Sequence, residues 1–379
     1  MKKNFTWLMA VLMLLPALAG CAPSATESIQ PSNTSSATAT LEPSDSAEEQ
    51  QPSTVVFTDS AGREVEVPAN ITKVAISGPM AQIYVFALAP DKLAGIAEEW
   101  DATAEQFLDT DYYNLPLLGQ LYGGKGEMNL ETLLASGAEV VIDIGESKKT
   151  IVEDLDALQQ QTGVPFVHIT ATTSTMGEAY RKLGELLNMP DEAEKLAVFC
   201  NNVYSRTQQI AEDVTKTKLL YCLGDKGLSV LANSSYHAEV VDMLSNNVAV
   251  VEDPSSKGSG NEVDMEQILL WNPDVILFAP DSIYSTVGED KVWQQVNAIS
   301  TGKYYEVPTA PYNWMGFPPA VQRCLGMMWM AKLLYPDAAQ YDLYEEVKTC
   351  YKLIYHCDIT REQYDAMVAN SIGKEWNNE

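Results

Sequence analysis

The sequence has 379 residues, of which 46% are hydrophobic, and its formal net charge at pH 7 is -28. A chain of this length exceeds the usual size of one hydrophobic core, so two lobes are expected. The negative charge argues against nucleic acid or anionic lipid as a partner, because every phosphate contact would oppose the protein's own field. Only five residues are Arg, which limits how many bidentate contacts could hold an anionic ligand.

Residues 1–20 are typical of an export signal. Lys2 and Lys3 precede an apolar run at 7–15, which is too short to span a membrane but has the length of a signal's hydrophobic region. The run leads to LAGC at 18–21, which resembles the lipobox of bacterial lipoproteins, where the cysteine is lipidated. Several acyl chains on Cys21 would give stable anchoring. We therefore expect an extracytoplasmic protein held to the cell membrane, on its outer surface or on its periplasmic side if an outer membrane exists.

Residues 21–53 consist mainly of Ser, Thr, Pro, Ala, Glu and Gln, with scarcely an aliphatic side chain. Such a composition cannot bury enough apolar surface to become ordered. It predicts a disordered tether between the lipid anchor and the folded part.

Two later segments share one pattern, ETLLASGAEVVIDIG at 131–145 and EQILLWNPDVILFAP at 266–280. Each begins with Glu, continues with apolar residues at helical spacing, passes a Gly or Pro that disfavours a helix interior, and ends in a buried strand. The repeat predicts two α/β lobes of related design. Chance recurrence of helix and strand would leave the matched Glu131 and Glu266 unexplained.

Strands and helices alternate over a first lobe predicted at 54–174, which favours a mainly parallel sheet with its ligand beyond the carboxyl ends of the strands. A Gly-rich turn near residue 122 lacks the Gly-Lys-Ser/Thr of a P-loop. The expected elements are a hairpin at 54–68, strands at 74–77, 93–96, 117–119, 140–144 and 165–169, and helices near 83–88, after 131 and after 150.

A helical region is predicted at 175–215, broken at 188–190, and its second helix would be about 35 Å long and able to join the lobes. The second lobe, at 216–336, repeats the alternation. Its expected strands lie at 218–223, 228–231, 248–251, 275–279 and 304–307. Residues 337–379 form a helical extension expected on the outside.

The five cysteines after Cys21 are an odd number, so buried thiols are expected rather than a disulfide framework. The three histidines show neither metal-ligand spacing nor a nucleophile arrangement. These observations favour a binding protein over an enzyme, without a resident metal or cofactor.

Taken together, the sequence resembles the solute-binding lipoproteins of ABC transporters that capture iron-siderophore, haem or cobalamin complexes. The resemblance covers about 54–336 and rests on TDSAGREVEVP, GEMNLETLL followed by AEVVI, EVDMEQILLWNPDVIL, the long helix and the lipobox. It implies two α/β lobes joined by one long helix, a ligand cleft between them, a metal chelate as ligand, and a permease dimer with a cytoplasmic ATPase as partner. We expect the protein to be a monomer.

The resemblance also implies that Glu131 and Glu266 dock onto the permease. Two exposed carboxylates at the same place in two related lobes suit two equivalent basic patches, and such charges set encounter rate and orientation. The alternative is that each Glu only stabilises the N-terminus of its own helix.

Aromatic planes beside a few polar groups suit a bulky chelate. We favour Trp314 and Tyr236 as ligand contacts, Trp314 because a Trp in a Pro-bounded loop should have few partners within the chain. Glu127, just before the MNLE segment, argues against cobalamin. A ligand-sensing lipoprotein and a direct metal-ion carrier using His237 remain alternatives. The candidate ligand contacts are Met80, Trp100, Tyr122, Lys125, Tyr236, His237, Tyr312, Trp314, Met315 and Arg323.

Overall fold

The computed structural model describes residues 53–121 and 128–372. The first lobe opens with the predicted hairpin, β1 (Thr54–Thr58) paired antiparallel with β2 (Glu64–Pro68). Gly62 in its turn has a φ of 79°, a left-handed conformation that glycine adopts without strain. The hairpin prediction is confirmed.

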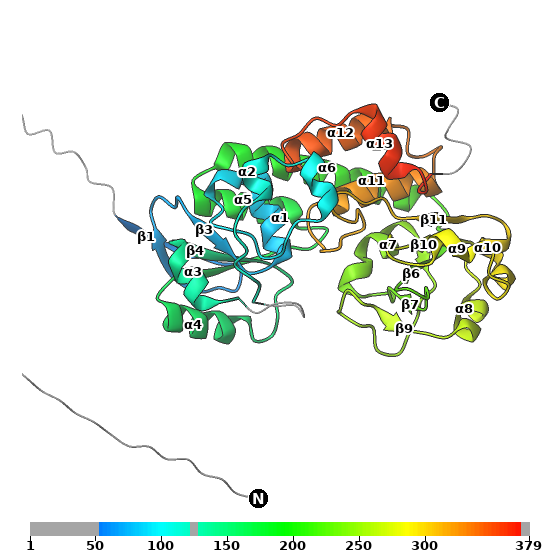
Figure 1. The fold of residues 1–379 in the computed structure, drawn as a ribbon, viewed down its shortest axis with the longest axis horizontal. Coiled ribbons are helices and arrows are strands. Elements are labelled where there is room, and N and C mark those ends of the chain that lie inside the picture. Colours follow the sequence, from blue (N-terminus) through cyan, green and yellow to red (C-terminus); the bar gives the residue numbers. More distant parts are fainter. Residues whose placement is uncertain (1–52, 122–127, 373–379) are drawn as a thin grey trace, which may run out of the picture. The chain divides into compact units, whose positions relative to one another are not determined.

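The sheet of the first lobe is parallel, in the order β3-β4-β5. Side chains alternate between its faces, so that Val140 and Ile142 enter one cluster of buried residues and Val141 enters another. Helices α1 and α5 cover the first face, and α3 and α4 cover the second (Figure 1). The elements are β3 (Val74–Ile76), β4 (Val140–Gly145), β5 (Phe166–Thr170), α1 (Pro79–Leu88), α3 (Leu130–Ser136) and α4 (Ile151–Thr162).

The segments at 93–96 and 117–119 form less regular structure than predicted. They make isolated parallel bridges, Val74 with Leu93 and Ile96 with Leu117, without becoming strands. The short helix η1 (Pro90–Lys92) precedes the first segment, and η2 (Ala102–Gln106) and α2 (Thr110–Tyr113) lie between the two. In the two segments Leu93, Ile96 and Leu118 are buried, as expected from the apolar pattern, whereas Leu117 is 50% exposed.

The helical region breaks where predicted, into α5 (Met176–Leu187) and α6 (Pro190–Asp213). Asn188 ends α5 in the left-handed conformation, with a φ of 55°, and Pro190 occupies the first turn of α6. With 24 residues, α6 is about 36 Å long. It leads directly from the first lobe into the second.

The second lobe has a mixed sheet in the order β11-β10-β6-β7-β9, with β8 also paired to β6. Strands β6, β8, β10 and β11 are parallel, and at the edge β7 runs antiparallel to its two neighbours, β6 and β9. The strands are β6 (Lys218–Leu223), β7 (Ser229–Val230), β8 (Asn246–Asn247), β9 (Asn261–Glu262), β10 (Val275–Phe278) and β11 (Tyr304–Glu306). The helices are η3 (Tyr236–Ala238), α7 (Glu239–Leu244), α8 (Met265–Trp271), α9 (Tyr284–Val287), η4 (Trp293–Gln295) and α10 (Asn297–Ser300).

One prediction about the later part of the chain was wrong. The strand expected at 248–251 is absent: β8 pairs earlier, at Asn246 and Asn247, and Val250 is 69% exposed. The C-terminal helices lie at the edge of the molecule and bury one face (Figure 1). Helix α12 (Leu343–Ile354) packs against α1 and against α11 (Arg323–Leu334), and its Tyr351 is fully buried. Helix α13 (Arg361–Val368) follows it.

One hydrophobic core extends through both lobes. It contains one face of each sheet together with buried side chains from α1, α5, α6, α11 and α12, and a second cluster lies on the other face of each sheet. Interiors packed in this way resist large rearrangement. The fold therefore favours small changes in the angle between the lobes. The predicted class, two α/β lobes with mainly parallel sheets joined by a long helix, is confirmed.

Candidate functional site

Two cavities lie where the lobes meet, and each is lined by residues of both lobes. The first, which we call the Tyr236 cavity, has a volume of about 670 Å³. The second, the Tyr312 cavity, has a volume of about 600 Å³ and lies beyond the carboxyl ends of β6 and β10. That is the position expected for a ligand of a parallel sheet. The Tyr236 cavity takes Glu146 and Thr172 to Ser174 from the first lobe and Ser234 to Tyr236 and Glu239 from the second.

Arg323 connects the lobes beside the Tyr236 cavity. Its Nη1 donates to Oγ1 of Thr173 in the first lobe at 2.9 Å and to Oε2 of Glu239 in the second lobe at 2.5 Å. Glu239 also accepts from the main-chain N and the hydroxyl of Thr173, at 3.0 and 2.7 Å. The side chain of Arg323 is 1% exposed, so this ion pair lies in a poorly solvated setting.

Tyr236 reinforces the same junction. Its hydroxyl donates to the main-chain O of Ala171 at 2.7 Å, and its own carbonyl accepts from Nη2 of Arg323. The guanidinium carbon of Arg323 lies 4.8 Å from the centroid of the Tyr236 ring, within the range of a cation–π contact. Burial raises the pKa of the Tyr236 phenol, so it remains a hydrogen-bond donor at neutral pH.

His237 lies beside this junction as a neutral imidazole. Its ring stacks on Phe317, with 5.3 Å between centroids and 27° between planes. Burial, and then the nearby charge of Arg323, lower the pKa of His237 to about 4. Its Nδ1 and the Nε of Arg323 find no hydrogen-bond partner among the described residues. Buried polar atoms of this kind can be satisfied by a bound ligand.

Other predicted contacts lie deeper than expected. Trp100 is buried, donating from Nε1 to the carbonyl of Tyr112 at 3.1 Å, and its ring lies 5.9 Å from that of Tyr312. Tyr312 lines its cavity and accepts a hydrogen bond of 3.2 Å from Gln82 of the first lobe. Met80, at the start of α1, is half-buried against Gly145. Tyr122 and Lys125 lie outside the described residues.

Trp314 does not lie in an exposed loop with few partners. Its side chain is fully buried and Met315 is 1% exposed, because the Pro-bounded loop packs onto α11. Gly326 of α11 makes this possible: a Cβ there would lie 2.4 Å from the carbonyl oxygen of Trp314. The structure places Trp314 in the core, where it has many neighbours within the chain.

Charge at the seam, the region where the two lobes meet, is mainly negative. Glu98, Glu99 and Asp101 line the Tyr312 cavity from the first lobe, and Asp281 lines it from the second. All five arginines of the chain are already engaged by carboxylates. The pairs are Arg63 with Asp59 and Asp156, Arg181 with Glu194, Arg206 with Glu346, Arg323 with Glu239, and Arg361 with Asp365. Within the described part of the chain, no three His, Cys, Asp or Glu side chains form a group that could hold a metal ion.

Glu131 and Glu266 are exposed and occupy equivalent positions. Each is the second residue of a seven-residue helix, α3 or α8. Asn129 and Asp264, two residues before them, cap the helices by accepting main-chain N–H bonds. The helices end in left-handed residues, Gly137 and Asn272, six positions after each Glu. The sequence repeat is therefore a structural repeat.

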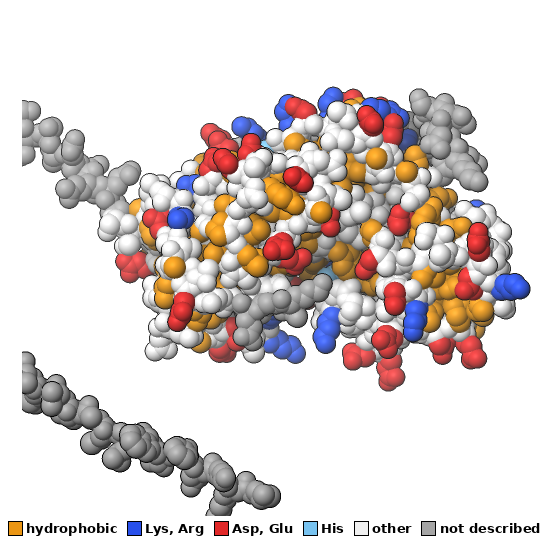
Figure 2. All heavy atoms as spheres, in the orientation of Figure 1, with side chains coloured by type: hydrophobic (Ala, Val, Ile, Leu, Met, Phe, Trp, Pro, Cys, Tyr) orange, Lys and Arg blue, Asp and Glu red, His pale blue; other side chains and the backbone are white. Residues whose placement is uncertain are grey.

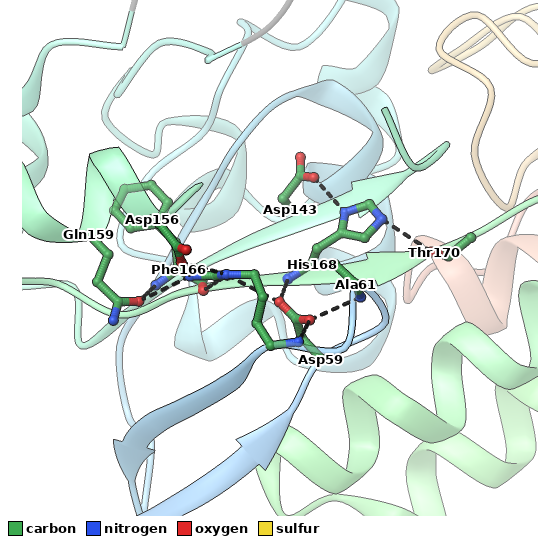
Figure 3. Close-up of polar contacts among 9 residues, drawn as sticks. Asp59, Ala61, Asp143, Asp156, Gln159, Phe166, His168 and Thr170 are labelled. Atoms are coloured by element: carbon green, nitrogen blue, oxygen red, sulfur yellow. Dashed lines mark hydrogen bonds and ion pairs between the residues drawn. The ribbon is translucent and has the colours of Figure 1, made fainter. Parts of the chain in front are cut away.

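The TDSAGR segment has a structural role. Oδ1 of Asp59 accepts from the main-chain N of Ala61 and of Arg63, both at 2.9 Å, and Oδ2 accepts from His168 N in β5 at 3.2 Å (Figure 3). Arg63 donates to the carbonyl of Phe166 at 2.7 Å. These bonds fasten the hairpin to the sheet. Nearby, Asp143 joins Nδ1 of His168 at 2.7 Å and accepts from the hydroxyl of Ser77.

Sequence reasoning missed Glu239, Thr173 and the carboxylates of the Tyr312 cavity. Glu239 follows the candidates Tyr236 and His237 within one helical turn, but nothing in the sequence indicates that it meets an Arg located 84 residues later. The acidic composition of residues 98–101 can be read from the sequence, but nothing in it indicates that this loop faces the second lobe.

Two α/β lobes with a shared core, a connecting helix and ligand-sized cavities at their seam define a two-lobed solute-binding protein. The profile of the periplasmic binding protein family matches residues 96–311, and the chain belongs to that family. It acts outside the cytoplasm as the solute-binding protein of an ABC transporter. Among the residues that the structure describes, no helix is both long and apolar enough to cross a membrane.

Known proteins agree with this assignment. The chain is 25% identical over 332 residues to the molybdate-binding protein MolA of Haemophilus influenzae, a match that covers 79% of this chain and 90% of that protein. An ABC transporter solute-binding protein from Sulfurospirillum deleyianum is similar in structure, with a TM-score of 0.76, 26% identity, and coverage of 83% of this chain and 99% of that one. A periplasmic solute-binding protein from Veillonella parvula has a TM-score of 0.68 and 26% identity, covering 84% and 98%.

Proposed function

We propose that the protein captures a metal chelate that is neutral or positively charged, such as a ferric hydroxamate siderophore, and delivers it to its permease. The protein is held to the membrane through a lipid on Cys21, which lies outside the described residues. The ligand occupies the cavities between the lobes, where Tyr236 and Tyr312 contribute aromatic surface. His237 is the neighbour of Tyr236 in the chain, and its unpartnered Nδ1 is available for a hydrogen bond.

The main support for this proposal is that the arginines are already paired with carboxylates. A multiply anionic ligand is held best by bidentate Arg contacts, and every Arg here already pairs with a carboxylate. The Tyr312 cavity is in addition lined by four carboxylates. Such a site repels anions and tolerates neutral or cationic guests. Carboxylate-rich siderophores and haem, with its two propionates, are disfavoured by the same argument.

Size supports an organic complex. Cavities of about 600 and 670 Å³ fall in the range of pockets for drug-sized ligands. A bare tetrahedral oxyanion would leave most of that space to water. Aromatic side chains at the seam provide flat apolar surface, which a bulky chelate can cover.

Molybdate is the second candidate, because it is the ligand of the similar protein MolA. The unpartnered Nε of Arg323 and the neutral His237 would offer hydrogen bonds to an oxyanion. A dianion would gain the full guanidinium of Arg323 only if Arg323 released Glu239, which would leave that carboxylate without its cation and close to the dianion.

A titration of the purified protein separates these candidates. Tryptophan fluorescence would be followed against a cationic ferric trihydroxamate, cyanocobalamin, haem, a ferric tricatecholate and molybdate. We expect saturable binding of a neutral or cationic chelate, with a dissociation constant below about 1 µM. Molybdate or the tricatecholate binding while the neutral and cationic chelates do not would overturn the charge argument.

We further propose that Glu131 and Glu266 dock onto basic patches of the permease dimer. Their exposure and equivalent placement in two related helices support this role. Neutralising both, as Glu131→Gln and Glu266→Gln, should leave ligand affinity unchanged and abolish uptake. The matched control is Glu178→Gln with Glu289→Gln, which removes two other exposed carboxylates. Normal uptake by the first double variant would instead favour a protein that presents its ligand to a signalling receptor.

A further inference from the structure

Each of the two docking helices carries an exposed leucine one turn after its glutamate. Leu134 of α3 is 51% exposed and stands three residues after Glu131. Leu270 of α8 is 78% exposed and stands four residues after Glu266. Residues at these spacings share one face of a helix. Both helices therefore present a carboxylate and an aliphatic side chain together.

Neither leucine anchors its helix. In α3 the fully buried residue is Leu133, and in α8 it is Ile268. Single exposed hydrophobic residues are common on protein surfaces and need no explanation. Here the exposure recurs beside the matched acid in both halves of a structural repeat, and Leu270 is the most exposed large hydrophobic residue among those described. Packing within the chain does not account for that recurrence.

A groove of about 580 Å³ adjoins the docking helix of the second lobe. Its lining combines apolar side chains with carboxylates, and one of them, Val250, is 69% exposed. Figure 2 shows Asp and Glu side chains along the edge of the molecule where β9 and α8 lie. The lining residues are Val250, Val251, Glu252, Glu262, Val263, Asp264, Gln267 and Trp271. Apolar side chains beside carboxylates are complementary to a segment that bears apolar and basic side chains.

We propose that Leu134 and Leu270 are the apolar anchors of the docking surface. Each inserts into an apolar pocket on the permease, next to the basic side chain that meets the neighbouring glutamate, and the groove beside α8 receives further contacts from the same partner. The proposal rests on the proposed docking by Glu131 and Glu266. In this arrangement the charges orient the encounter, while the leucines provide apolar burial at the centre of each contact.

The test uses the ligand-loaded protein and the complete permease–ATPase complex in lipid nanodiscs. The variant Leu134→Ser with Leu270→Ser should bind the complex at least about tenfold more weakly, because it lacks the two apolar side chains that become buried on docking. Its ligand affinity and thermal stability should match the unaltered protein. The control, Val198→Ser with Val292→Ser, removes two exposed valines of 43% and 47% exposure elsewhere on the surface and should bind normally. Leu134→Met with Leu270→Met keeps the apolar surface and should retain binding.

Varying the salt concentration separates the apolar contribution of the leucines from the electrostatic contribution of the glutamates. The loss caused by the serine variant should persist between about 0.05 and 0.5 M salt, whereas the loss caused by Glu131→Gln with Glu266→Gln should shrink as salt screens the charges. Unchanged affinity of the serine variant would overturn the inference while leaving the glutamate docking intact. Unchanged affinity of the glutamine variant would instead remove the proposed docking itself.

Discussion

The hydroxyl of Tyr236 in the second lobe donates a hydrogen bond of 2.7 Å to the main-chain oxygen of Ala171 in the first. The guanidinium of Arg323 lies over the same ring and donates a hydrogen bond to Thr173 of the first lobe. One aromatic residue thus joins the lobes through its hydroxyl and supports the buried cation that joins them a second time. Opening the seam requires both contacts to break.

Tyr236→Phe removes the first contact and keeps the ring. We expect the unfolding free energy to fall by about 1 kcal/mol, the usual net value of one hydrogen bond. Because this bond crosses the seam, we also expect ligand to dissociate several-fold faster. Stopped-flow fluorescence measures the dissociation rate, and urea unfolding measures stability.

Tyr341→Phe is the matched control for this experiment. The hydroxyl of Tyr341 donates to the carbonyl of Met328 at 2.6 Å, and the bond does not cross between the sheets of the two lobes. The control should lose similar stability and release ligand at the normal rate. Equal dissociation rates for both variants would show that the Tyr236 bond does not hold the lobes together.

Glu239→Gln tests the ion pair at the seam. It leaves the guanidinium of Arg323, which is 1% exposed, without its carboxylate. An uncompensated buried charge costs about 3 kcal/mol, so we expect a clear fall in the unfolding free energy. Glu194→Gln alters the surface pair with Arg181, whose side chain is 41% exposed, and should leave stability unchanged within error. Equal urea midpoints for the two variants would contradict a buried, stabilising pair.

Local signals in the sequence were sufficient for most of the architecture. The break between α5 and α6 followed from Asn188 and Pro190, and the related docking helices followed from Glu, apolar spacing and a break at fixed offsets. Caps and breaks act within a few residues, so they can be recognised without knowing the fold. The exposed Glu131 and Glu266 emerged from the same kind of pattern.

Contacts between distant segments were not accessible in this way. Trp314 was expected at the surface because of its neighbouring prolines, but Gly326 lets the loop pack directly on α11. The number of arginines limited the anionic ligands that could be bound, yet the pairing of Arg323 with Glu239 depends on how two lobes and a late helix meet. Val250 fits a buried strand by composition, and it is exposed because β8 pairs with β6 before reaching it. Tertiary placement decides each of these outcomes.

Asp59→Asn should destabilise the protein without altering ligand binding. The Asp59 carboxylate accepts four hydrogen bonds, including one from Arg63 at 3.1 Å and one from His168 N at 3.2 Å. An amide offers a single acceptor oxygen and no charge, so we expect a loss of about 2–3 kcal/mol in unfolding free energy. Glu64→Gln, at an exposed position on the same hairpin, is the control. Weaker ligand binding with unchanged stability would show that this segment serves the ligand rather than the fold.

His237 should make the protein less stable as pH falls from about 6.5 to about 4. Burial and Arg323 lower the pKa of its imidazole from 6.5 to about 4, so in this window the unfolded chain takes up a proton that the folded chain refuses. Stability from this residue is fully present above pH 6.5, declines with decreasing pH, and reaches its limit below about pH 4, with a total loss of about 3 kcal/mol. His237→Gln keeps Arg323 and Glu239 but removes the titrating group. Urea unfolding at several pH values gives the pH dependence of the unfolding free energy, and hence the number of protons taken up on unfolding. That number should be smaller in the variant by up to one. An equal pH dependence in the two proteins would contradict a buried neutral imidazole.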